Sequence, residues 1–331
     1  MVTGLCWTAR GKRGLLSRAC KRTSYPCPSI THENAVTGTL LRQIGIIGVG
    51  MIGASVAAAV RSREITTRIV AYSPGEDAKI ALAAGWIDHV CEQATDCLEG
   101  SDLVVLSAPV SSIMHLMPLI AQCLAQQASE GKPLTRLTDT GSSKQGIVAA
   151  SQALGPNKAV FVPAHPIAGS ERRGAAAANP DLFVNRMVLL CQGDDIAVES
   201  FNVVSRFWQS LGARTATIHA KLHDEVYAEV SHWPHAAAFA LCLGIARGPL
   251  AEHSVARAGA GLKDTTRIAA SDPALWTDIL LSNKAATLAS AQRHRQALSD
   301  LIERIEQDDR AALVELLTKA SQWRQGLQDL A

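Results

Sequence analysis

Short apolar runs alternate with amphipathic stretches along the first two thirds of the chain, and this pattern predicts alternating strands and helices. The predicted strands cover residues 44–50, 68–72, 102–107 and 134–139, with helices at 51–61, 77–84 and 111–127 between them. Such alternation is typical of a Rossmann-type α/β fold, in which helices cover a doubly wound parallel sheet. Later elements are expected at 159–163 and 186–191, as strands that extend the same sheet, then at 196–211 as a helix and 214–218 as a strand.

The pattern changes after His219, where strand signals stop and helix-forming residues dominate. Long helices are predicted at 222–247, 274–306 and 308–329, with apolar positions such as Leu298, Leu301, Ile302 and Ile305 on one face. A small helical domain cannot easily bury this much apolar surface alone, so we expect a homodimer formed through these helices. The predicted domains are a disordered basic tail (1–42), a dinucleotide-binding Rossmann domain (43–220) and an all-helical substrate and dimerisation domain (221–331).

Composition and charge exclude two classes of partner. The chain is 47% hydrophobic and has a formal net charge of +2, and residues 1–32 carry six basic and no acidic side chains. From Glu33 onward the chain is therefore slightly acidic, which argues against nucleic acid and against a membrane surface as partners. No apolar run approaches the roughly 20 residues that span a bilayer.

The eight cysteines are scattered without a CxxC pair, which indicates reduced thiols and favours a cytoplasmic location. The basic tail leaves a second location open. An acid-free, basic and serine-containing N terminus also fits a transit peptide for an organelle, if residues 1–40 serve that purpose. A start placed too far upstream, or a disordered extension, explains the same tail more simply.

A glycine turn, Gly48-x-Gly50-x-x-Gly53, follows the first predicted strand and opens the first predicted helix. The first glycine permits a tight turn, the second lets the backbone approach a pyrophosphate, and the third lets helix and strand pack closely. The motif alone is weak evidence, but the flanking strand, the helix and the second strand make it a dinucleotide-binding unit. The candidate cofactor contacts are Gly48, Gly50, Met51, Ile52, Gly53, Ser73, Ala108 and Pro109.

The end of the second predicted strand usually decides between NAD and NADP, because an acidic residue there holds the ribose 2′-hydroxyl of NAD. This chain has Ser73, followed by Pro74 and Gly75. A carboxylate that would repel a 2′-phosphate is missing, and so is an arginine in the next few residues that would attract one. NAD and NADP therefore both remain candidate cofactors.

Three further motifs lie far apart in the sequence: Asp139-Thr-Gly-Ser-Ser-Lys144, His165-Pro-Ile-Ala-Gly-Ser-Glu171, and Ser231-His-Trp-Pro-His235 with Lys263-Asp-Thr-Thr-Arg267 downstream. Together with the glycine turn, their order and spacing resemble the prephenate and arogenate (cyclohexadienyl) dehydrogenase family over about residues 44–330. The resemblance implies oxidative decarboxylation of prephenate to 4-hydroxyphenylpyruvate in tyrosine biosynthesis, with hydride transfer to NAD(P). By the same resemblance a histidine at the second position of the SHxPH motif favours prephenate, and use of arogenate stays open.

The resemblance implies a catalytic role for His165, and the chemistry agrees. A neutral histidine can hydrogen-bond the substrate hydroxyl and take its proton while hydride leaves the same carbon. His165 follows the run 159–163, at the carboxyl end of a strand, where open α/β sheets bind ligands. By resemblance, Ser142 hydrogen-bonds the same hydroxyl or positions His165. The matching positions for Ser170 and Glu171 lie near the substrate.

Substrate binding is expected in the helical half. Arg267 offers a planar fork that matches a carboxylate bidentately, and His235 can add a donor. Both match substrate-holding positions of the family. Trp276 corresponds to a position near the substrate ring and also fits a plain core role.

Other interpretations of the same residues stay open at this point. His219 and His223 are four residues apart, but no HExxH pattern or third ligand accompanies them, so we favour a solvated helix face and expect no metal. A 3-hydroxyacid-type dehydrogenase of the same architecture would need a catalytic lysine, for which Lys263 is the only nearby candidate. A non-catalytic dinucleotide sensor would need neither His165 nor Arg267.

Overall fold

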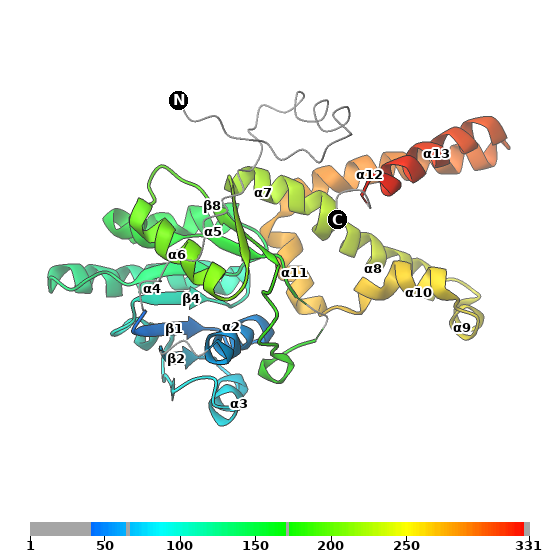
Figure 1. The fold of residues 1–331 in the computed structure, drawn as a ribbon. Coiled ribbons are helices and arrows are strands. Elements are labelled where there is room, and N and C mark those ends of the chain that lie inside the picture. Colours follow the sequence, from blue (N-terminus) through cyan, green and yellow to red (C-terminus); the bar gives the residue numbers. More distant parts are fainter. Residues whose placement is uncertain (1–40, 64–66, 170–171, 328–331) are drawn as a thin grey trace, which may run out of the picture.

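A six-stranded parallel sheet forms the centre of the first half of the protein, as seen in a computed structural model (Figure 1). The structure describes residues 41–63, 67–169 and 172–327. The strands are β1 (Gln43–Ile47), β2 (Arg68–Tyr72), β3 (His89–Val90), β4 (Leu103–Leu106), β5 (Arg136–Asp139) and β6 (Phe161–Val162). Their order is β3-β2-β1-β4-β5-β6, so the winding reverses between β1 and β4. Ligands of open α/β sheets bind at such a switch point.

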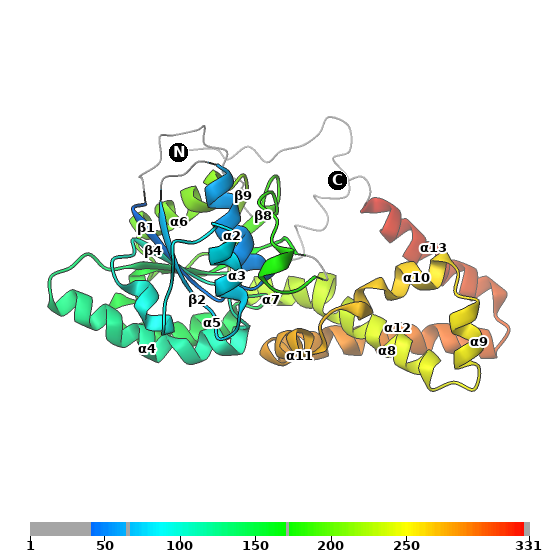
Figure 2. The ribbon, with the colours of Figure 1, turned by 90° about the horizontal axis from the view of Figure 1, so that it is seen from below.

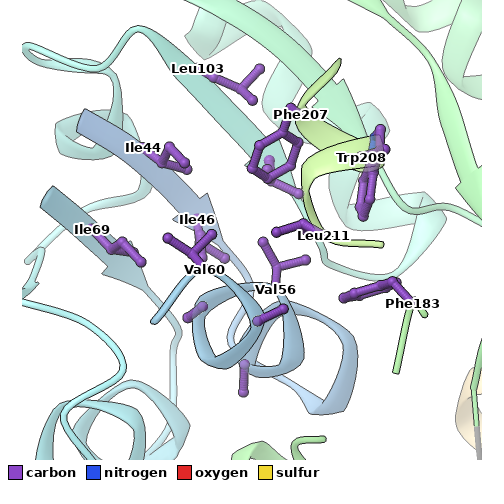
Figure 3. Packing of buried hydrophobic residues seen from close by; sticks show 14 of the residues in the cluster. Ile44, Ile46, Val56, Val60, Ile69, Leu103, Phe183, Phe207, Trp208 and Leu211 are labelled. Carbon is purple, nitrogen blue, oxygen red and sulfur yellow. The ribbon is translucent and has the colours of Figure 1, made fainter. Parts of the chain in front are cut away.

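Helices cover both faces of this sheet, whose central strands are buried throughout and almost entirely apolar. Every residue of β1 and β4 is buried, which requires cover on both sides. One face packs against α2 (Met51–Ser62), α3 (Asp77–Ala83) and α6 (Val198–Ser210). The other face packs against α4 (Val110–Ser129) and α5 (Gln145–Ala150). Figure 3 shows the first of these cores, where α2 and α6 close over the side chains of β1.

A second sheet of three strands corrects one expectation from the sequence. Its strands are β7 (Ala164–Pro166), β8 (Met187–Cys191) and β9 (Arg214–Ile218), with β7 antiparallel and β9 parallel to β8. The prediction that residues 186–191 extend the parallel sheet is therefore wrong. Pro163, between β6 and β7, has no amide hydrogen for a strand ladder, so the chain leaves the first sheet there. The new strand β7 then pairs with β8.

The helical half begins with one long helical stretch. It consists of α7 (Ala220–Tyr227), a π turn (Ala228–His232) and α8 (Trp233–Ala246), which together match the helix predicted at 222–247. Pro234 lacks an amide hydrogen for the preceding turn, and a π turn accommodates that break.

The remaining helices differ from the prediction in one break and two additions. The helix predicted at 274–306 is divided at Asn283 into α11 (Pro273–Ser282) and α12 (Lys284–Glu306). At the break the backbone of Asn283 departs from helical geometry (φ −115°, ψ 37°), and its side chain makes the buried hydrogen bonds described below. The last helix is α13 (Arg310–Gly326), and two helices too short to predict from periodicity are α9 (Ala251–Ala256) and α10 (Ala260–Thr266).

The helices α12 and α13 extend away from the sheets in both views (Figures 1 and 2). They expose large apolar side chains, namely Leu288, Leu298, Ile302, Ile305, Val314, Leu317 and Trp323. Within the described part of the chain, no helix combines the length and the apolar character needed to cross a membrane.

Candidate active site

The turn after β1 has the backbone geometry that its glycines predict. Gly48 has φ +95°, and a Cβ there would lie 2.3 Å from the carbonyl oxygen of Ser107. A Cβ at Gly53 would lie 2.0 Å from the carbonyl oxygen of Gly48. Only glycine fits these two positions. A Cβ at Gly50, in contrast, would meet nothing within 4 Å, so the backbone there faces open space.

The N terminus of α2 can receive an anion. Its N-cap, Gly50, provides no side-chain cap, and no acidic residue stands in the first turn of this 12-residue helix. Free amides and the helix dipole both attract a pyrophosphate. Met51 and Ile52 in this turn are partly exposed, and the segment of Ala108 and Pro109 lies directly across from Gly48, at the start of α4. These residues fit a dinucleotide at the β1–β4 switch point.

The loop after β2 carries carboxylates, but contacts within the protein already engage them. Ser73 is partly exposed at the end of the strand. Asp77 accepts a hydrogen bond from the amide of Ala175 at 2.8 Å, and Glu76 pairs with Lys79 at 2.9 Å. The loop therefore offers no free carboxylate dedicated to a ribose 2′-hydroxyl, and it distinguishes NAD from NADP no better than the sequence does.

Asp139 and Lys144, the two ends of the second motif, form a fully buried ion pair. Lys144 Nζ also donates to the carbonyl oxygen of Ala164 at 2.7 Å, and Asp139 Oδ1 accepts from the amide of Ala164 at 2.9 Å. The amide of Gly141 donates to the same carboxylate at 2.8 Å. The pair therefore fixes the end of β5 to the start of β7, the strand that carries His165.

His165 begins a chain of three hydrogen-bonded side chains. Its Nδ1 lies 2.8 Å from Nε2 of His223, and Nδ1 of His223 lies 2.8 Å from Oδ1 of Asp224. The Asp224 carboxylate also accepts from the amides of Lys144 at 2.7 Å and Gln145 at 2.9 Å. The chain thus connects β7 to α7 and to the start of α5.

The electrostatic environment keeps both histidines of this chain neutral. Burial lowers the pKa of His165 well below 6.5, and charge on His223, Lys144 and His232 acts in the same direction. Burial also lowers the pKa of His223, although Asp224 partly opposes this. Burial alone would raise the pKa of Asp224, but the hydrogen bonds from His223 and from two amides outweigh it and lower that pKa. A neutral His165 has a lone pair that can take a proton.

Tyr227 and His232 add to the buried surroundings of this chain. The Tyr227 ring stacks on His223 at 4.5 Å between centroids and lies 4.9 Å from His165. Burial raises the pKa of Tyr227 to about 12, so it stays a phenol. Burial lowers the pKa of His232 to about 4. Its Nδ1 lies 3.0 Å from Nδ2 of Asn283, and its buried Nε2 has no hydrogen-bond partner in the described residues.

His235, Arg267 and Trp276 gather in the helical half. His235 stacks on Trp276 with ring centroids 3.6 Å apart, and its Nδ1 donates to the carbonyl oxygen of Ser231 at 2.8 Å. Burial lowers the pKa of His235, and the nearby charge of Arg267 lowers it further. A neutral His235 therefore presents Nε2 as an acceptor and donates to a carboxylate only when protonated. Arg267 is exposed and makes no salt bridge within the described part of the chain.

The other predicted site residues are placed less completely. Ser142 lies between β5 and α5, and its backbone is close enough to His232 to raise the pKa of that ring slightly against the larger effect of burial. In the described residues no hydrogen bond joins the Ser142 hydroxyl to His165. Ser170 and Glu171 lie outside the described residues.

Sequence reasoning missed His223, Asp224 and Asn283. The prediction that His219 and His223 share a solvated helix face holds for His219, which is exposed, but is wrong for His223, which is fully buried. The physical reason is that both ring nitrogens of His223 find partners, so its burial carries no unpaired polar group. The adjacent His-Asp pair just after a strand was the available signal, because it combines an imidazole with a carboxylate.

The fold and the site together define a class of enzyme. A glycine turn at the switch point of a doubly wound sheet, an uncapped helix N terminus and a partly buried, neutral histidine belong to an NAD(P)-dependent dehydrogenase with a Rossmann domain. The helical half adds an exposed arginine that can bind an anionic substrate.

Comparison with known proteins narrows the class to one family. Models of the prephenate dehydrogenase family match both halves of the chain, the nucleotide-binding domain over residues 56–217 and the dimerization domain over residues 219–319. The chain belongs to the prephenate dehydrogenase family, which confirms the resemblance found from the motifs. It is 32% identical to a cyclohexadienyl dehydrogenase of Zymomonas mobilis, over 76% of this chain and 84% of that protein.

Solved structures agree with this assignment. A prephenate dehydrogenase from A. aeolicus, in complex with hydroxyphenyl propionate and NAD+, is 31% identical with a TM-score of 0.75, covering 86% of this chain and 98% of that one. An arogenate dehydrogenase from Synechocystis is 25% identical with a TM-score of 0.70, covering 86% of this chain and 99% of that one. The Rossmann fold followed by a helical domain, predicted from the sequence, is therefore confirmed.

Proposed function

We propose that this enzyme oxidatively decarboxylates prephenate to 4-hydroxyphenylpyruvate, with hydride transfer to NAD(P), in tyrosine biosynthesis. The observation that carries the proposal is His165, held neutral by burial at one end of a hydrogen-bonded chain, in a protein of this family. Relatives support the substrate, since a protein of Lactococcus lactis named prephenate dehydrogenase is 30% identical over 87% of this chain and 78% of its own length.

His165 is the proposed proton acceptor. The ring hydroxyl of prephenate must lose its proton as hydride leaves the same carbon, and His165 accepts it at Nε2 because Nδ1 is engaged with His223. NAD(P), held by the glycine turn and the first turn of α2, supplies the hydride acceptor when bound. Loss of the ring carboxylate as carbon dioxide makes the ring aromatic, and the proton returns to the phenolate oxygen. Ser142 is proposed to hydrogen-bond the hydroxyl or to orient His165.

Arg267 is the proposed anchor for a substrate carboxylate. Prephenate is a dianion, and an unpaired carboxylate in a partly desolvated pocket is costly. The exposed guanidinium of Arg267 can pair with one carboxylate bidentately. His235, close to Arg267 and stacked on Trp276, is proposed to bind beside it, and a bound carboxylate would favour its protonated, donating form. Ser170 and Glu171 are also proposed to contact the substrate, and this proposal rests on the sequence motif alone.

The proposal is tested by mixing the enzyme with prephenate and either NAD or NADP and following absorbance of the reduced nicotinamide. We expect reduction with prephenate and release of one carbon dioxide for each cofactor reduced. Arogenate, tested in parallel, measures the second reaction, which the names of two relatives favour. Cofactor that binds but is not reduced with either substrate would overturn the proposal and favour a dinucleotide sensor.

We also propose a homodimer formed through the helical half. The match to a dimerization domain supports it, and so do the exposed apolar side chains of α12 and α13. In this arrangement residues 43–220 hold the cofactor, and residues 221–331 bind substrate and the second copy. A cytoplasmic location is proposed as well, which agrees with five free cysteines in the described residues, and fractionation of the source cells tests it.

A further inference from the structure

We infer that Asp224 sets the proton positions of two active-site histidines in opposite senses. Its carboxylate selects the Nδ1–H form of His165 through His223, and its main-chain carbonyl selects the Nε2–H form of His232 through Asn283. His165 then offers a lone pair at Nε2 and can accept a proton there, whereas His232 offers an N–H at Nε2 and can donate a hydrogen bond. This inference rests on the proposed function and deepens it, since Asp224, His223 and Asn283 act as positioning residues behind the reacting groups.

The first arm follows from what each atom can do. A carboxylate only accepts hydrogen bonds, so the 2.8 Å contact between Asp224 Oδ1 and His223 Nδ1 places the His223 proton on Nδ1. A neutral His223 then has its lone pair at Nε2, which lies 2.8 Å from Nδ1 of His165. His165 must therefore carry its own proton on Nδ1. Its Nε2 keeps a lone pair, which is the form a general base requires.

The carboxylate that starts this arm is held ionised and in place. The amides of Lys144 and Gln145 donate to its two oxygens at 2.7 and 2.9 Å. These bonds favour the charged form, so the pKa of Asp224 is lowered despite its burial. The buried Lys144 Nζ is itself engaged by Asp139 and by the carbonyl oxygen of Ala164.

The second arm begins at the backbone of the same residue. The carbonyl oxygen of Asp224 only accepts, so the 2.7 Å contact with the Asn283 side chain fixes the amide nitrogen of Asn283 toward it. The second hydrogen of that amide points to Nδ1 of His232 at 3.0 Å. Nδ1 of His232 must then be the acceptor, and its proton lies on Nε2. That nitrogen is buried without a hydrogen-bond partner in the described residues.

Burial keeps both His165 and His232 neutral, and the two arms give the two neutral rings different functions. The groups that act on His165 are Lys144 at the N-cap of α5, His223 and His232, and the phenol ring of Tyr227 lies beside it. The carboxylates of Asp139 and Asp224 act on His223. A neutral imidazole without a fixed partner interconverts between its two forms. The contacts of Asp224 remove that freedom at both rings.

The direct test is nitrogen NMR of the wild-type protein labelled with 15N-histidine. Spectra of His165→Asn and His232→Asn variants assign the two residues. We expect His165 to show a protonated Nδ1 and His232 a protonated Nε2 at neutral pH. A His165 ring protonated on Nε2, or a His232 ring protonated on Nδ1, would overturn the inference. The measurement needs no turnover, so its outcome is independent of whether prephenate is the substrate.

A kinetic test uses Asp224→Asn, with Glu225→Gln as the matched control on an exposed carboxylate of the same helix. The amide that replaces the carboxylate can donate to His223, which reverses the first arm and removes the lone pair from Nε2 of His165. We expect kcat to fall at least about a hundredfold, because a carboxylate-to-amide change that leaves a wrong histidine tautomer costs up to about 10⁴-fold. The KM for prephenate and the binding of cofactor should change little, and Glu225→Gln should match wild type. A kcat loss without a change in the NMR signature of His165 would contradict the inference.

A second pair of variants keeps the test informative if Asp224→Asn does not fold. Gln at position 223 can still accept from Nδ1 of His165, whereas Leu cannot. We expect His223→Gln to retain more activity than His223→Leu and to keep the Nδ1–H signal of His165. Equal kcat in the two variants would show that His223 acts only by filling space. If the wild type has the predicted proton positions but does not oxidise prephenate, the inference stands and the proposed function fails.

Discussion

The two halves of this protein bury their side chains to very different degrees. In the sheet half, α2 buries eight of its 12 residues, and the central strands are buried throughout. In the helical half, α12 buries two of 23 residues and α13 buries none. A helix with an apolar face and nothing packed against it needs a partner for stability. The comparison teaches that the first half completes its own core, whereas the second half requires another surface.

The functional side chains show the same contrast. Around His165 the charged groups Asp139, Lys144 and Asp224 are all paired within the protein. In the helical half, Arg267 is exposed and makes no salt bridge in the described residues. The proposed catalytic groups are therefore in place before substrate arrives, and the proposed anion-binding group, Arg267, would receive its partner from the substrate. The following predictions test this division.

The largest effect is expected on kcat, from loss of the proposed general base in the sheet half. His165→Asn should lower kcat by about 10²–10⁴-fold, because the residue lost is the proposed general base. Cofactor binding should survive, since the glycine turn is separate from β7, and titration of NAD fluorescence or calorimetry measures it. Near-normal turnover in this variant would remove His165 from the mechanism.

The buried ion pair should matter for stability rather than for binding. Lys144→Met leaves the Asp139 carboxylate buried without its partner, and breaking such a pair costs about 3–5 kcal/mol in the free energy of unfolding. Lys79→Met, which removes an exposed lysine paired with Glu76, is the matched control and should change stability little. Urea unfolding measures the free energy of unfolding of both variants. Similar losses in the two would mean that the buried Lys144–Asp139 pair stabilises the fold no more than an exposed pair does.

Arg267 should determine the affinity for substrate and have little effect on the affinity for the cofactor. Arg267→Ala should raise the KM for prephenate at least about tenfold, because one partner of a charge pair is lost, and Arg267→Lys should recover only part of this. Steady-state kinetics with each substrate varied in turn measures both constants, with Arg257→Ala as an exposed-arginine control. A rise in the KM of the cofactor, with that of prephenate unchanged, would contradict the assignment.

The smallest effect is expected on the outer face of α12. Leu298 is exposed in the single chain, and burial of a leucine contributes about 1.5–3 kcal/mol. Leu298→Lys should therefore weaken the proposed dimer, whereas Gln296→Lys, with the same new residue on another face of α12, should not. Light scattering over a dilution series compares the two, and a wild-type protein that is monomeric throughout would refute the dimer.

Much of the fold was predictable from the sequence because it depends on local pattern. The bounds of β2 and β9 match the predicted runs, and the glycine turn stands where its spacing required. The pairing of β8 was not predictable, because an apolar run does not say which sheet it joins.

The site divides in the same way between local and distant information. His165 and Arg267 stand in motifs that can be seen in the sequence. The roles of His223, Asp224 and Asn283 depend on contacts between segments as many as 80 positions apart, which no periodicity encodes. Such buried hydrogen-bond networks appear only once the helices are docked.

The central claim is that a base in the sheet half acts on a substrate anchored by the helical half, and the pH dependence of kcat/KM for prephenate tests it most directly. His165 must be unprotonated to accept a proton, and burial lowers its pKa well below 6.5. Activity should therefore rise with pH, reach half of its plateau well below pH 6.5 and stay level above it. Arg267→Ala should lower kcat/KM at every pH without moving this midpoint. The residual activity of His165→Asn should show no such rise of kcat/KM with pH. A wild-type midpoint at or above pH 6.5, or the same rise of kcat/KM with pH in His165→Asn, would contradict the account.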